Sequence, residues 1–95
     1  MLVITQVDFN NPAQAAQWLK LLDTYARDPM GGGKPLSDFA HQHLCERIKL
    51  RTDFVSFIAY ENNEPVGLIN AIEGFSTFNA RPLMNIHDVV VVQDA

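Results

Sequence analysis

The stretch that decides the fold is FVSFIAY at 54–60, followed by NNEP at 62–65 and VGLINAIEGF at 66–75. Successive side chains of a strand point to opposite faces, and along 54–60 this period of two leaves both faces largely apolar. The turn-forming run at 62–65 separates the strand from the second apolar run. Together the three segments predict an antiparallel hairpin.

Two further strands flank this hairpin in the sequence. A link at 76–82 leads to a strand over 83–92, whose four consecutive valines place valine on both faces. Such a strand requires cover on both sides. The β-branched opening LVITQV at 2–7 predicts another strand, which a turn at 8–11 ends. We therefore expect a four-stranded, mostly antiparallel sheet.

Two helices are expected between the first and second strands. Asn11 followed by Pro12 is a helix-start signal, and apolar residues at three- and four-residue spacing continue to about Arg27, before Pro29. Ser37 is a suitable N-cap for a second helix that ends around Arg51. The connection DPMGGGKP at 28–35 is an irregular loop. The fold class is α+β, in the order β-α-α-β-β-β.

Composition limits the domain count and the class of partner. The chain has 95 residues and a formal net charge of −4, so residues 1–95 are expected to form a single domain without affinity for nucleic acid or anionic membranes. No apolar run reaches the about 20 residues that span a bilayer. The single cysteine, Cys45, and the absence of a basic leader predict a cytoplasmic location.

Four segments resemble part of a known enzyme family. ARDPMGGGKPL at 26–36, GLIN at 67–70, EGFSTF at 73–78 and NIHDVVV at 85–91 are similar to a bacterial subgroup of the GNAT acyl-CoA N-acyltransferases. The resemblance implies that the fold is a partial GNAT fold. It implies that a backbone N–H among Val89, Val90 and Val91 polarises the thioester carbonyl of acetyl-CoA. It also implies that the loop and helices flank an acceptor pocket, with Tyr25, Asp28 and Met30 as acceptor-binding candidates.

The sequence departs from the family after the valine run. In the family this strand leads into an Arg/Gln-x-x-Gly-x-Gly/Ala loop, whose backbone N–H groups hold the pyrophosphate of acyl-CoA. The present sequence reads Gln93-Asp94-Ala95. We therefore expect a truncated GNAT-like domain that has no acetyltransferase activity alone and binds no cofactor as an isolated chain. Acetyl-CoA is implied only if the fold is completed.

The last strand is central in the complete family sheet, so here it is expected to leave an open edge. We predict homodimerisation, or pairing with a second-half chain, through Leu83–Val92. One alternative is half of an acetyl-CoA-dependent N-acetyltransferase that another chain completes. The other is a binding module that uses the acceptor cleft for a small ligand or a peptide.

Candidate catalytic residues lie on the last two strands. The period of two places Asn85 and His87 on one face and Asp88 on the other. His87 is a candidate proton relay, Glu73 on the neighbouring strand is a candidate base acting through a water, and Asn85 is a further acceptor-binding candidate. The alternative interpretation is that these are hydrogen-bonded structural groups.

Two other motifs are set aside. The glycine-rich loop lacks the spacing and the preceding strand of a P-loop. On the second helix His41 and Cys45 share a face that His43 does not, and two ligands do not make a closed zinc site, so no metal is expected.

Overall fold

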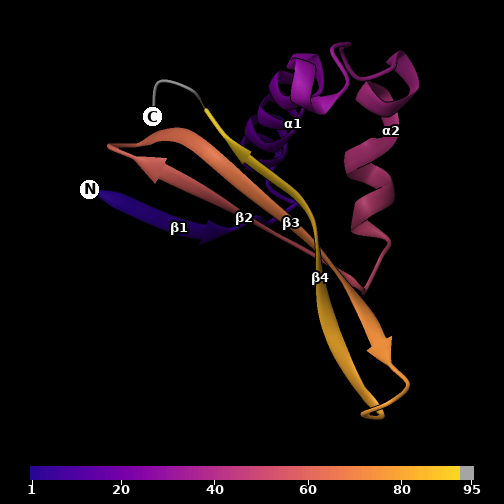
Figure 1. Cartoon of the computed structure of the whole chain (residues 1–95). Helices are drawn as coiled ribbons and strands as arrows, with labels where there is room; N and C mark the ends of the chain where they lie inside the picture. Colours follow the sequence, from indigo (N-terminus) through magenta and orange to yellow (C-terminus); the bar gives the residue numbers. More distant parts are fainter. Residues whose placement is uncertain (93–95) are drawn as a thin grey trace.

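The computed structural model describes residues 1–92. The elements in chain order are β1 (Leu2–Gln6), α1 (Pro12–Arg27), a short 3-10 helix η1 (Pro29–Gly31), α2 (Asp38–Lys49), β2 (Phe54–Glu61), β3 (Glu64–Ser76) and β4 (Arg81–Val91). Figure 1 shows the strands in one twisted sheet, with α1 and α2 beside it. The predicted α+β class and the order β-α-α-β-β-β are confirmed.

The sheet contains four antiparallel strands in the order β1-β2-β3-β4. The predicted hairpin is therefore confirmed, but β3 begins two residues earlier than expected. The reason is a turn of two residues, Asn62 and Asn63, whose φ angles of 51° and 70° are those of a tight hairpin turn. The far ends of β3 and β4 form an arm that extends beyond the rest of the sheet (Figure 1).

Both helices begin where the capping residues predict. The Asn11 side chain accepts hydrogen bonds from the backbone N–H groups of Ala13 and Gln14, and Pro12 is the first helical residue. The Ser37 hydroxyl accepts from the N–H of Ala40 at 3.1 Å. Helix α2 ends at Lys49, slightly before the expected Arg51.

The glycine-rich loop has a defined shape. The carboxylate of Asp28 accepts from the N–H of Met30 at 2.9 Å, and the carbonyl of Asp28 accepts from the N–H groups of Gly31 and Gly33. A Cβ at Gly31 would lie 2.0 Å from the carbonyl oxygen of Tyr25, and Gly32 has a φ of 116°. These two positions require glycine, so loop geometry accounts for much of this motif.

The core lies between the helices and one face of the sheet. Its buried apolar side chains come from α1, α2 and the strands, and include Trp18, Leu21, Ile48, Ile58, Leu68 and Val90. Burying an aliphatic side chain of this kind contributes about 1.5–3 kcal/mol. The rings of Phe9 and Phe54 pack edge-on against Trp18. Trp18 is thus a central residue of the core.

Within residues 1–92, no helix is both long enough and apolar enough to cross a membrane.

Candidate functional site

A cavity of about 330 Å³ opens between the two helices and the sheet, and we call it the helix-side cavity. Its walls are mainly apolar, and its polar groups come from β3, β4 and the segment that follows α2. It is lined by Trp18, Leu22, Leu44, Ile48, Arg51, Phe54, Asn70, Ile72, His87 and Asp88. An apolar cavity with a few converging polar groups is the usual form of a small-molecule site.

A buried chain of hydrogen bonds connects the core to this cavity. The indole N–H of Trp18 lies 2.8 Å from Asn70 Oδ1 and 2.9 Å from Ser56 Oγ. Trp18, Ser56 and Asn70 are each only 1% exposed. The amide nitrogen of Asn70 then donates to Asp88 Oδ2 at 3.1 Å.

Chemistry determines which way the Asn70 amide points. An indole N–H can only donate, so the atom of Asn70 that faces Trp18 is the oxygen. The amide nitrogen therefore points to Asp88, whose ionised carboxylate can only accept. The core thus holds a hydrogen-bond donor toward Asp88 in a fixed orientation.

A β-bulge in β4 changes the predicted arrangement of polar residues. Asn70 pairs with Asp88 but Ala71 pairs with Ile86, so His87 is an extra residue between the two pairs. Ile72 pairs with Asn85, which puts Asn85 on the same sheet face as Asp88. The prediction that Asp88 points away from Asn85 and His87 was therefore wrong, because simple alternation takes no account of the bulge.

Glu73 lies on the other face of the sheet. Its neighbours in β3, Asn70 and Ile72, line the helix-side cavity, and the period of two turns Glu73 away from them. Glu73 is exposed and pairs with Met84. The structure therefore does not bring Glu73 and His87 together in one site, as the shared acceptor role required.

The three acceptor candidates around the glycine-rich loop do not share the cavity that His87 lines. Tyr25 is half-buried and packs against the core, and the Asp28 carboxylate is occupied as the cap of η1. Met30 is 87% exposed. None of the three lines the helix-side cavity.

The valine run presents alternating backbone groups to the free edge of β4. The N–H of Val92 donates to the carbonyl of Val66 in β3 at 2.8 Å. In an antiparallel ladder every second residue bonds to the same neighbour, so Val90 also faces β3. The N–H groups of Val89 and Val91 consequently point to the outer edge. The N–H of Val90 points inward to β3, and the Val90 side chain is buried, with 5% exposed.

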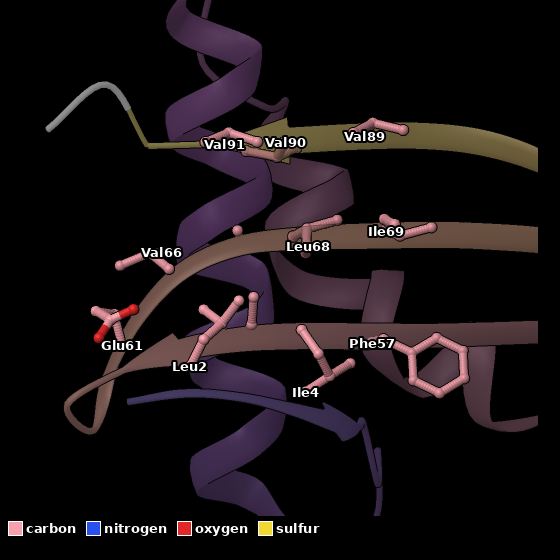
Figure 2. A pocket seen from close by; sticks show the side chains of 12 residues that line it. Leu2, Ile4, Phe57, Glu61, Val66, Leu68, Ile69, Val89, Val90 and Val91 are labelled. Atoms are coloured by element: carbon pink, nitrogen blue, oxygen red, sulfur yellow. The ribbon is translucent and has the colours of Figure 1, made fainter. Parts of the chain in front are cut away.

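The opposite face of the sheet is apolar and largely exposed, and we call it the open face. It carries a shallow cavity of about 350 Å³ between side chains of all four strands. Figure 2 shows Leu2, Ile4, Phe57, Ile69, Val89 and Val91 around this cavity, with both helices behind the sheet. Their exposed fractions run from 37% for Phe57 to 72% for Val91.

Ion pairs surround the helix layer. Arg51 lines the helix-side cavity but donates to both oxygens of Asp53, at 2.8 and 2.6 Å. This bidentate contact raises the pKa of Arg51 and lowers that of Asp53. Arg51 is thus already paired at the rim of the cavity.

Asp23 joins α1 to the start of α2. Its carboxylate accepts from the backbone N–H of Leu36 at 2.9 Å and contacts Arg27 and His41. These contacts, the Leu36 N–H first, lower the pKa of Asp23. Burial raises the pKa of the Cys45 thiol on α2.

Across residues 1–92, no three His, Cys, Asp or Glu side chains gather as metal ligands would. His41 contacts Asp23, and His43 contacts Glu46 at 3.2 Å.

Comparison with known proteins identifies the fold. No protein-family model matches the chain, and no curated protein matches it. Solved structures do. An aminoglycoside acetyltransferase from an uncultured soil metagenomic sample matches with a TM-score of 0.71 at 20% identity, over 98% of this chain and 57% of that one.

Two further solved structures also match the fold. A GNAT family acetyltransferase from Staphylococcus aureus matches with a TM-score of 0.72 at 15% identity, over 98% of this chain and 64% of that one. A ribosomal-protein-alanine N-acetyltransferase from Brucella melitensis matches with a TM-score of 0.73 at 13% identity, over 100% and 59%. The chain thus has a partial GNAT acetyltransferase fold and spans about three fifths of the length of these structures.

Sequence reasoning missed Asp88 and Asn70 as site residues. Their pairing depends on the register of β3 against β4, which the link at 76–82 left open. The sequence does show polar residues within otherwise apolar strands. It does not show which of these polar residues contact one another.

Proposed function

We propose that residues 1–95 form the acceptor-side half of a GNAT N-acetyltransferase, and that this half transfers no acetyl group by itself. The observation that carries the proposal is the fold match, which covers nearly all of this chain and 57–64% of the acetyltransferases above. The helix-side cavity supports it as a place for an amine. Acetyl transfer then requires further polypeptide beside β4.

The free edge of β4 supports a role in pairing. Within residues 1–92, the outward N–H groups of Val89 and Val91 are two donors beside which the sheet has no further strand. We propose that another strand pairs here, either from a second copy or from a second-half chain, over Leu83–Val92. In the completed fold one of these N–H groups polarises the thioester carbonyl of acetyl-CoA. We expect this assembly in the cytoplasm.

The proposed chemistry is proton removal from an amine that attacks the thioester. His87 lines the helix-side cavity and is exposed, so its imidazole is our candidate for the base, directly or through a water. The attacking nitrogen forms a bond to the acetyl carbon, the carbon–sulfur bond breaks, and the CoA thiolate leaves.

The first test is calorimetric titration of the 95-residue chain with acetyl-CoA, with the particle mass measured by light scattering on the same sample. We expect no saturable heat and no CoA release with amines, at a mass of twice the 10.7 kDa chain. CoA release would contradict the proposed inactivity, and saturable heat would contradict the expected absence of acetyl-CoA binding. A 10.7 kDa particle at high micromolar concentration would contradict self-association.

A second test adds a candidate second-half polypeptide. CoA release that appears only in the mixture, and that His87→Gln lowers by about 10²-fold, would support the enzyme half and the role of His87. CoA release that His87→Gln leaves unchanged would remove His87 from the mechanism.

A small-ligand binding module is the second candidate function. The helix-side cavity favours it, because a cavity of this kind can bind a ligand without any acetyl transfer.

A further inference from the structure

The helix-side cavity holds a carboxylate without a cation. Asp88 lines the cavity and is partly buried, and within residues 1–92 it forms no ion pair. Among the lining residues Arg51 carries a permanent positive charge, and it is bound at both oxygens of Asp53. A carboxylate in an apolar cavity is stabilised by an opposite charge that brings hydrogen-bond donors.

The buried chain of hydrogen bonds holds this carboxylate in position. Asn70 donates to Asp88 Oδ2, and the orientation of Asn70 is set by Trp18 and Ser56, which are nearly inaccessible to solvent. Such rigid support is expected for a binding group, because a prearranged carboxylate loses little side-chain freedom when a ligand binds. A surface carboxylate would not need a buried tryptophan behind its partner.

The rest of the lining limits the ligand. The walls are apolar side chains of α1, α2, β2 and β3, and Asp88 is the only carboxylate among them. Arg51 at the rim is already paired with Asp53, so the lining offers one carboxylate, Asp88, to one ammonium group. The complement of this surface is therefore one ammonium group attached to an apolar body.

We propose that Asp88 binds the ammonium group of a primary monoamine whose apolar or aromatic part fills the helix-side cavity, with Asn70, Ser56 and Trp18 as positioning residues. The identification of this amine as the acetyl acceptor rests on the proposed function. Binding of the amine requires neither acetyl-CoA nor a second-half chain.

The probe is phenethylamine, titrated into the 95-residue chain without acetyl-CoA. Trp18, the only tryptophan, lines the cavity, so its fluorescence reports binding directly. We expect saturable binding that Asp88→Asn weakens by at least about tenfold, since a charged hydrogen bond is lost. The neutral isostere 2-phenylethanol should bind about equally to the two proteins. Asp38→Asn, which removes one negative charge from the exposed start of α2, should leave the affinity unchanged.

A second variant tests the cavity itself. Ile72→Phe enlarges a wall residue and keeps Asp88, and we expect it to weaken phenethylamine binding while the circular dichroism of the folded protein persists. Equal affinity in wild type and Asp88→Asn would overturn the proposal. So would tighter binding of an aminoglycoside such as kanamycin than of phenethylamine. Failure of amine binding leaves the acetyl-CoA and mass measurements unaffected, so the two proposals fail separately.

Discussion

The two faces of the sheet are built from adjacent residues of the same strands, yet they differ in exposure. Leu68 is 2% exposed on the helix-covered face, whereas Ile69, the next residue, is 40% exposed on the open face. Val90 and Val91 differ in the same way, at 5% and 72%. Both faces are apolar, so hydrophobicity of a residue does not by itself determine burial. What differs is that α1 and α2 cover one face only.

The largest expected effect is the contrast between these two neighbours. Leu68→Ala should lower the free energy of unfolding by about 2–5 kcal/mol, because it leaves a cavity in the core. Ile69→Ala should cost less than about 1 kcal/mol, because its side chain is already partly in water. Urea denaturation of the two variants measures both values. A similar cost for both would show that the open face is covered in solution.

The next effect concerns the buried polar group of the covered face. Trp18→Phe should cost about 1–3 kcal/mol through the lost N–H donor, because Asn70 Oδ1 and Ser56 Oγ then lose a partner in the core. Ser56→Ala is the matched comparison. In Ser56→Ala the Trp18 N–H still donates to Asn70 Oδ1, so the decrease in the free energy of unfolding should be smaller than in Trp18→Phe. An equal loss in the two variants would argue against Asn70 as the main acceptor.

A third prediction distinguishes the two edges of the sheet, β4 and β1. Val91→Pro removes an outward N–H from β4 without removing a bond to β3, and should weaken self-association by at least about tenfold if β4 is the pairing edge. Gln6→Pro makes the equivalent change at the β1 edge, because the adjacent Val7 N–H bonds to Ser56 and Gln6 faces outward. Light scattering over a dilution series compares them. Loss of association in Gln6→Pro alone would move the contact to β1.

The smallest effect tests what holds the helix cover together. The pKa of Asp23 is lowered in the folded state, chiefly by the N–H of Leu36, so its contribution to stability is present above the unfolded pKa of about 3.9. That contribution is lost as the pH falls through the lower folded pKa. Asp23→Asn should therefore be less stable than wild type at pH 7, and the difference should shrink below about pH 4. Thermal unfolding across this range checks the trend, and a constant difference would contradict it.

Local signals predicted most of the secondary structure. Asn11-Pro12 and Ser37 each predicted the start of a helix correctly, because a cap is satisfied within a few residues of itself. The residues 54–60 predicted β2 for the same reason, since alternation is local. Strand ends were less exact. β4 begins at Arg81 and not at Leu83, because the turn before it is shorter than its composition suggested.

The candidate site depended on information that no short segment contains. His87 was identified as a candidate from the sequence. The predicted placement of Asp88 on the opposite face from His87, and of Glu73 in the same site as His87, was wrong. One bulge residue shifts the alternation of side chains, so residues before and after it lie, relative to one another, on the opposite faces from those that simple alternation predicts. Bulges depend on how two strands pair. Trp18 and Asp88, distant in sequence, are joined only through Asn70 in a third element.

The sequence by itself determined the element order, the capped helices, the glycine loop and the alternating strands, because these depend on contacts among near neighbours. The tertiary structure alone decided which apolar face is covered, which valine N–H groups reach the free edge, and which polar side chains line the cavity. These properties depend on strand register and on the side from which the helices pack. Both are set by contacts between residues far apart in the chain.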